Sequence, residues 1–161
     1  MGQQQLLLVI LVTILVGIAT VVAINVFGDA AEQGNRDAVR QDLLQASAAA
    51  QAVWSKPALL GGAGRDFSTT NIVNDDDILR NIGIPGIVSN GVLTNENGEY
   101  SIDSRDRLTL VIEADPATYR NTITLTVTRE DPEGDPGDDG GVWLTEIDDG
   151  GDITISEPAP L

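Results

Sequence analysis

A long apolar stretch opens this chain. Residues 6–27 read LLLVILVTILVGIATVVAINVF, and three glutamines stand directly before them. No charged side chain occurs before Asp29. At ~1.5 Å per residue a helix of this length is long enough to cross the hydrocarbon core of a bilayer. The sequence therefore predicts an N-terminal helix whose first half is apolar.

After residue 28 the pattern becomes amphipathic. Apolar side chains recur at spacings of four, three, four and three, which places them on one face of a helix; they are Val39, Leu43, Ala46, Ala50 and Val53. Pro57 disfavours helical backbone at the residue before it, and the glycines of residues 61–64 indicate a loop. We expect one helix from about Gln3 to Trp54, with Gly17, Gly28 and Gly34 as its weak points.

In the rest of the chain polar and apolar residues alternate, which predicts antiparallel strands. The candidate strands are residues 99–103, 107–113, 121–128, 142–147 and 152–156, with turns expected at Asn97-Gly98 and Asp115-Pro116. Apolar positions that share a face are expected to form the core; they are Leu108, Leu110 and Ile112 in one strand and Ile123, Leu125 and Val127 in the next. Residues 65–96 are expected to be irregular, with loops marked by Gly83, Pro85, Gly86 and Gly91.

The expected fold class is α+β, a long N-terminal helix packed on a small antiparallel sheet of four or five strands. In domain terms, residues 1–28 form an apolar helix, residues 29–56 an amphipathic helix, and residues 57–161 a β-rich domain with acidic loops.

The apolar stretch has three interpretations: a cleaved secretory signal, a permanent membrane anchor, or the packing surface of an assembly. A cleaved signal needs a basic beginning and an apolar region of only about 7–15 residues. Here no Lys or Arg precedes Arg36, and the stretch is longer. The other two interpretations remain open on these grounds.

The stretch MGQQQLLLVILVTILVGIATVVAINVF, followed by GNRDAVRQDLLQASAAAQAVWSKPALLGGAG, resembles the type IV filament superfamily of pilins and pseudopilins. The resemblance implies a structural subunit of an extracellular, cell-surface filament that polymerises with copies of itself after an inner-membrane intermediate. It also implies a prepilin peptidase, an assembly ATPase and a membrane platform protein as partners. The alternatives are a pseudopilin of a type II-like secretion system and a monomeric membrane-anchored periplasmic binding domain.

The chain departs from that family at its start. Family members usually carry a glutamate at the fifth mature position; here that residue is Gln5, or Leu7 if processing follows Gly2. Hydrogen bonding of the glutamines between subunits is one expectation, and a position at the membrane interface is the other. No proline occurs near residue 22, where many bacterial pilins have one. The residues expected in the filament core are Gln3, Gln4, Gln5, Leu6, Val9, Thr13, Gly17, Thr20 and Ala23, the small ones allowing close helix approach.

The chain has no Cys and no His. It therefore has neither disulfides nor the attachment motif of a c-type haem, and zinc sites and acid–base catalysis lose their most common participant. No catalytic arrangement is recognisable, and we do not expect an enzyme.

The formal net charge is −16, and eleven acidic residues but no basic one follow Arg129. This balance disfavours binding to nucleic acid, which needs Lys and Arg to neutralise phosphates. Oxygen-rich loops suit Ca²⁺, and the candidate ligands are Asp131, Glu133, Asp135, Asp138 and Asp139. The bidentate glutamate of a calcium loop is missing at the expected distance, so a solvated acidic loop without a cofactor is favoured. The same interpretation applies to Asp75–Asp77 and Asp148–Asp149.

Overall fold

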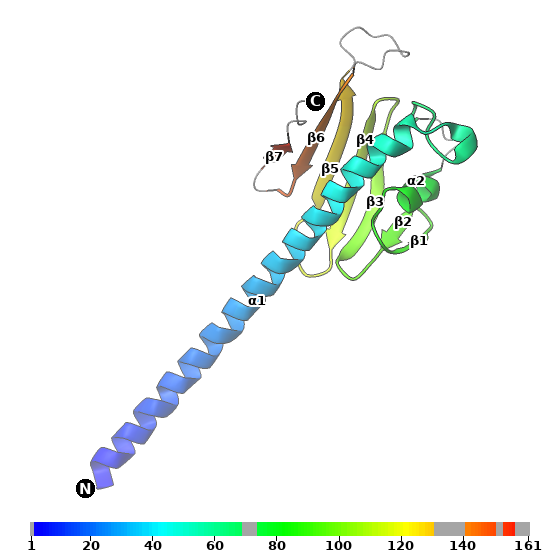
Figure 1. Cartoon of the computed structure of the whole chain (residues 1–161). Helices are drawn as coiled ribbons and strands as arrows, with labels where there is room; N and C mark the ends of the chain where they lie inside the picture. The colour runs from blue at the N-terminus through cyan, green and yellow to red at the C-terminus, as the bar shows by residue number, and fades with distance from the viewer. Residues whose placement is uncertain (1, 69–73, 131–140, 151–152, 157–161) are drawn as a thin grey trace. The chain divides into compact units, whose positions relative to one another are not determined.

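The computed structural model describes residues 2–68, 74–130 and 141–150, and the backbone of residues 153–156. The chain falls into two compact units, residues 1–34 and residues 35–161. Its architecture is a long helix and one antiparallel sheet, with a short second helix beside them (Figure 1). The predicted α+β class is confirmed.

Helix α1 spans Gly2–Ser55 without interruption. The glycines expected to weaken it, Gly17, Gly28 and Gly34, all lie within continuous helix. The helix ends where the sequence predicts, and a short 3-10 helix, η1 (Ala58–Leu60), follows. The next loop folds back on the last turn, where the amide of Ala63 donates to the carbonyl of Val53 at 2.8 Å. Gly62 is required here, because a Cβ atom at this position would lie 2.2 Å from the Lys56 carbonyl oxygen.

The five apolar positions predicted to share one helix face are all buried, which confirms that expectation. They belong to the same core as buried side chains of the central strands, which are Tyr100, Leu110, Ile112, Ile123, Leu125 and Val127. Leu108 lies just before its strand and is only partly buried against this core. Within residues 35–161, the amphipathic part of α1 thus packs on one face of the sheet.

The sheet has seven strands in chain order, each antiparallel to the next. They are β1 (Ile87–Ser89), β2 (Val92–Thr94), β3 (Gly98–Arg105), β4 (Thr109–Pro116), β5 (Ile123–Glu130), β6 (Val142–Asp148) and β7 (Ile153–Ser156). The pairing of Ile112 with Leu125, and of Leu125 with Ile147, aligns buried positions across three strands. The pairing of β3 with β4 shifts at Asp103, between Ile102 and Ser104.

The expectation that residues 65–96 are irregular was wrong, as was the count of four or five strands. This region contains β1, β2 and helix α2 (Asp75–Asn81). Asn74 and Asp77 form a reciprocal capping box at the start of α2, and the three aspartates of its first turn are favourable at a helix N-terminus. Ile78, Leu79 and Ile82 are completely buried. The run Asp75–Asp77 is therefore the start of a helix rather than a solvated loop.

The turn expected at Asp115-Pro116 is also absent, because β4 continues through both residues. Pro116 is the last residue of β4 and pairs with Gly98, the first residue of β3. A proline is tolerated at the end of a strand, where no ladder hydrogen bond is lost. Gly98 allows the close approach, because a Cβ atom there would lie 2.3 Å from the Asp115 carbonyl oxygen.

Candidate functional site

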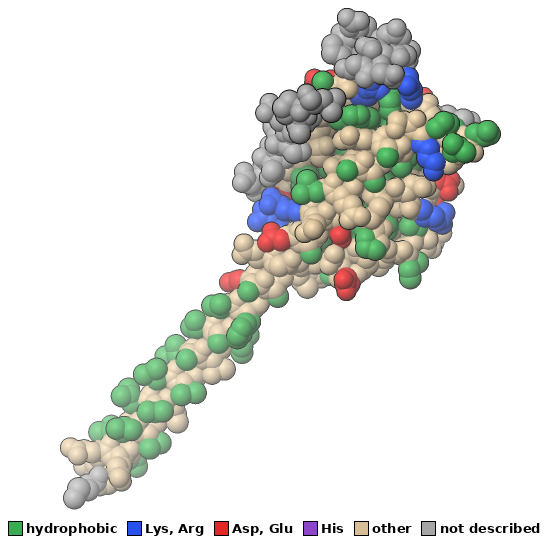
Figure 2. Space-filling model, viewed as in Figure 1, with side chains coloured by type: hydrophobic (Ala, Val, Ile, Leu, Met, Phe, Trp, Pro, Cys, Tyr) green, Lys and Arg blue, Asp and Glu red, His purple; other side chains and the backbone are tan. Residues whose placement is uncertain are grey.

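The apolar segment, defined as residues 6–27 of α1, exposes its side chains. Its large hydrophobic residues range in exposure from 47% at Ile10 to 74% at Phe27. Figure 2 shows hydrophobic side chains along this part of the helix, without charged residues among them. In the part of the chain that the structure describes, α1 is the one helix long and apolar enough to cross a membrane. Its length and composition are compatible with association with a membrane.

The residues predicted to lie in the filament core, from Gln3 to Ala23, are all in this helix and exposed. Gly2 is also exposed, and a Cβ atom there would meet nothing within 4 Å. The hydroxyl of Thr13 donates to the carbonyl of Ile10, and that of Thr20 to the carbonyl of Val16, each at 2.8 Å. These two hydroxyls are therefore satisfied within their own helix and are not needed as donors to another chain.

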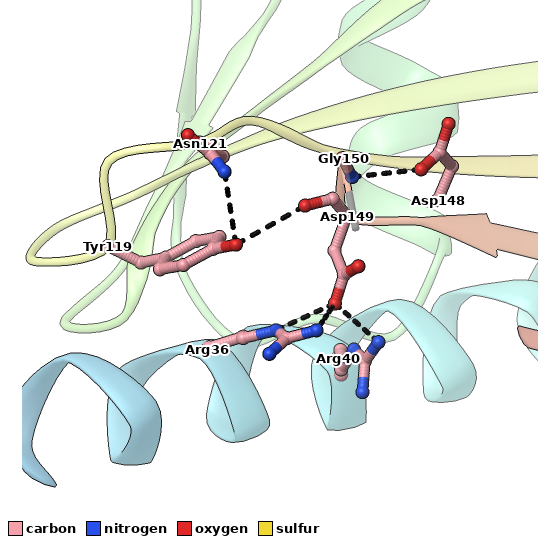
Figure 3. A network of polar contacts seen from close by, with 7 residues as sticks. All are labelled: Arg36, Arg40, Tyr119, Asn121, Asp148, Asp149 and Gly150. Atoms are coloured by element: carbon pink, nitrogen blue, oxygen red, sulfur yellow. Dashed lines mark hydrogen bonds and ion pairs between the residues drawn. The ribbon is translucent and has the colours of Figure 1, made fainter. Parts of the chain in front are cut away.

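In the unit of residues 35–161, a buried carboxylate binds two arginines of α1 (Figure 3). Asp149, which follows β6, is completely buried and accepts from Arg36 Nε at 2.6 Å. Arg40, one helical turn later, pairs with the same carboxylate oxygen. The hydrogen bond to Asp149 raises the pKa of Arg36 above its ordinary value, so the guanidinium stays charged. The expectation that Asp148–Asp149 is simply solvated was thus wrong for Asp149.

A second carboxylate, that of Asp42 in α1, binds the turn between β2 and β3. Asp42 accepts hydrogen bonds from the side-chain amides of Asn95 at 3.1 Å and Asn97 at 2.8 Å. It also accepts from the hydroxyl of Tyr100 at 2.7 Å. Burial of the Tyr100 ring, followed by this hydrogen bond, raises the pKa of the Tyr100 hydroxyl above its ordinary value. The hydroxyl therefore stays protonated and continues to donate at alkaline pH.

Asn35 extends these contacts to a third turn. Its amide donates to the carbonyl of Asn97 at 2.8 Å and accepts from the backbone amide of Thr118 at 3.0 Å. The turns after β2, β4 and β6 lie at the same end of an antiparallel meander. Each of these turns contacts residues 35–42 of α1. Sequence reasoning missed this arrangement. Asn35 and Asp42 lie on the same helical stripe as Val39 and Ala46, and polar residues on an apolar stripe were the available indication.

The other end of the packed helix is fixed by aromatic contacts. The rings of Trp54 and Trp143 meet edge to face, with centroids 5.4 Å apart. The Arg129 guanidinium lies 4.4 Å from the Trp54 ring centroid, and Trp54 Nε1 donates to the Arg107 carbonyl at 3.1 Å. These contacts stabilise the domain and offer no nucleophile.

The five candidate calcium ligands lie outside the described residues, so the structure does not test that hypothesis. Among the residues it describes, no group of three or more acidic, His or Cys side chains is arranged to hold a metal ion. The outer face of the sheet does carry a shallow acidic hollow, where Glu99 is paired directly with Asp115.

Comparisons of the chain with protein-family models, with curated proteins and with solved structures found no match. Two features of the molecule itself bear on its function. One is the exposed apolar segment, and the other is the sheet domain packed on the later part of the same helix.

Proposed function

We propose that this protein is the structural subunit of an extracellular helical filament of the type IV pilin kind. Subunits polymerise through the apolar segment, and the sheet domain forms the outer surface of the filament. The observation that carries the proposal is the combination of a fully exposed apolar segment with an amphipathic continuation of the same helix that packs on an antiparallel sheet.

The apolar segment cannot remain exposed to water. Burying it would remove on the order of 2,000 Å² of apolar surface from solvent, which is worth tens of kcal/mol before entropic costs. In a bilayer, lipid covers this surface; outside the bilayer, other copies of the chain must do so. Because each copy presents the same helix, head-to-tail contacts that do not close produce an open helical polymer.

The polar contacts of residues 35–42 support this role. Three turns of the sheet are bound to one short stretch of α1 through Asn35, Arg36 and Asp42. A polymer of identical subunits requires each domain to hold its helix in the same way. Partly buried, directional hydrogen bonds supply that uniqueness better than apolar packing alone.

The proposal includes a membrane stage and assembly partners. Before assembly the segment lies in a membrane, and a prepilin peptidase acting near Gly2, an assembly ATPase and a platform protein follow from the family resemblance. The role is structural rather than enzymatic. A pseudopilin uses the same helix in a short polymer, and a monomeric anchored domain uses it only in lipid.

Electron microscopy of material sheared from expressing cells tests the proposal, together with mass spectrometry of its N-terminus. The expected result is long thin fibres built from chains that retain residues 6–27. Val9→Asp, which places a charge in the apolar segment, is the negative control and should give no fibres. Protein that is found only in membranes, without fibres, would overturn the filament proposal in favour of the anchored domain or the pseudopilin.

A further inference from the structure

Asn25 is an amide within the apolar segment, and in the described part of the chain it has no hydrogen-bond partner. The segment has three side chains able to form hydrogen bonds: Thr13, Thr20 and Asn25. Both threonines are satisfied within the helix, as described above. Among the residues that the structure describes, the exposed Asn25 side chain makes no hydrogen bond. An amide enclosed by apolar side chains is costly unless it finds a partner, so assembly must supply one.

The first turn of α1 offers complementary groups. Gln3, Gln4 and Gln5 are exposed, and their side chains make no hydrogen bond within the described part of the chain. Each side-chain amide carries a donor and an acceptor, so one Asn and one Gln can form two reciprocal hydrogen bonds. The backbone N–H groups of the first helical turn also lack intrahelical partners. No charged side chain within residues 1–28 competes for these groups.

The separation of Asn25 from Gln3–Gln5 along the helix determines how two copies must be offset for these groups to meet. Asn25 lies 20 residues after Gln5 and 22 after Gln3, so the two groups are about 30 Å apart along the helix at ~1.5 Å per residue. They cannot meet within one straight helix. Three consecutive glutamines, at steps of ~100° around the axis, cover more than half of the circumference. A glutamine therefore faces a neighbouring helix over a wide range of rotations.

We propose that Asn25 of one subunit hydrogen-bonds with the first turn, Gln3–Gln5, of a neighbouring copy that is shifted by about 30 Å along the helix axis. This contact sets the axial offset between those two subunits. The inference rests on the proposed function, because it requires neighbouring copies. In a bilayer Asn25 lies four residues from Asp29, near the aqueous interface, and water satisfies its amide. The contact therefore belongs to the assembled state.

Cross-linking of the full chain tests the contact directly. The protein has no cysteine, so introduced thiols are the only ones present. The thiols are placed four residues after Gln4 and Asn25, on the same helix faces, so that both amides are kept. The test variant combines Asp29→Cys with Leu8→Cys, and the matched control combines Asp29→Cys with Leu15→Cys, which lies seven residues further along the same face as Leu8. Sheared filaments are treated with a short bis-maleimide, because a disulfide needs Cβ atoms about 4 Å apart and a bonded pair of amides separates them further.

The expected product of the test variant is a ladder of linked subunits, because each chain joins one neighbour through residue 29 and another through residue 8. The control variant should give no ladder, and either single variant can give at most dimers. Filaments whose test variant shows no ladder, whose control variant shows an equal one, or whose Asp29→Cys single variant forms dimers as the main product would overturn the proposed offset. Absence of fibres from the unmodified chain would instead overturn the proposed function, so the two failures are distinguishable.

A second measurement examines the hydrogen bond rather than proximity. Asn25→Leu keeps the segment apolar, and Thr20→Val removes a hydroxyl that is already satisfied within its helix. We expect filaments of Asn25→Leu to lose the uniform axial spacing of the unmodified filament, measured by helical reconstruction, and Asn25→Gln to restore it. Asn25→Leu filaments with the same uniform spacing as Thr20→Val filaments would overturn the inference.

Discussion

Asp149 and Arg36 are separated by 113 residues in the chain, yet the carboxylate of Asp149 accepts a hydrogen bond from Arg36 Nε at 2.6 Å. The carboxylate is completely buried, whereas the Arg36 side chain is 28% exposed. Arg40 reaches the same oxygen, so one acidic group at the end of β6 holds two positively charged groups one helical turn apart. The contact fixes the turn that follows β6 to α1, the helix whose buried side chains share a core with the central strands.

Asp149→Asn should destabilise the domain by about 2 kcal/mol, because it leaves two arginines without their negative partner while keeping the side-chain shape. Urea denaturation of the detergent-solubilised full chain, followed by tryptophan fluorescence, measures the change. Glu146→Gln is the control, since Glu146 is exposed on β6, the strand that Asp149 follows, and it should change stability by less than about 0.5 kcal/mol. Equal effects of the two substitutions would show that the buried contact contributes nothing.

The sequence was most informative where a pattern repeats. The positions Val39, Leu43 and Ala46 follow the helical period, and the alternation around Leu110 and Leu125 follows the strand period; both sets are buried. Short elements were missed because β1 and β2 have only three residues each, too few for a period to be visible. The glycines and the proline of residues 83–91 concealed helix α2, which has seven residues and whose capping box was readable at Asn74 and Asp77.

One part of the candidate site, the apolar segment, was also predictable from a continuous pattern in the sequence. The 22-residue apolar stretch, residues 6–27, needs no partner to be recognised as a packing surface. The partners of Asp42 and Asp149 lie more than 50 residues away in the chain, and no local pattern identifies such partners. Asp149 looked like a member of an acidic pair, and only the arrangement of the chain in space distinguishes it from Asp148.

Alkaline pH should destabilise the protein partly through Tyr100. Its pKa is raised in the folded state, so above the unfolded value of about 10 the unfolded chain loses a proton that the folded chain keeps. The stabilisation is complete below that pH and decreases as the pH rises further. Urea midpoints measured from pH 8 to pH 11 should therefore decrease more steeply for the unmodified chain than for Tyr100→Phe. Parallel slopes for the two proteins would contradict this assignment.

Trp54→Phe should cost about 1–2 kcal/mol, because it removes the hydrogen bond to the Arg107 carbonyl and weakens the stacking of Arg129. Trp143→Phe should cost less, because Trp143 pairs edge to face with Trp54 and is only partly buried against the core. Thermal unfolding of the two single variants measures the difference. A larger loss at Trp143 would mean that the ring pairing, rather than the polar contacts of Trp54, stabilises this end of the domain.

Charge within the apolar segment should matter far more than the loss of a terminal amide. Val9→Asp places a carboxylate within the apolar segment, a change that costs about 2.5–3.5 kcal/mol at the centre of a membrane helix and less towards its end. Gln5→Ala removes one of three adjacent amides, and Gln3 and Gln4 remain to make the same hydrogen bonds. The yield of sheared fibres per cell should thus fall to background for Val9→Asp and only modestly for Gln5→Ala, with Val9→Leu as the matched control that keeps the wild-type yield. Equal yields from Val9→Asp and Gln5→Ala would mean that residue 9 is not buried in the polymer, and the apolar segment would no longer explain assembly.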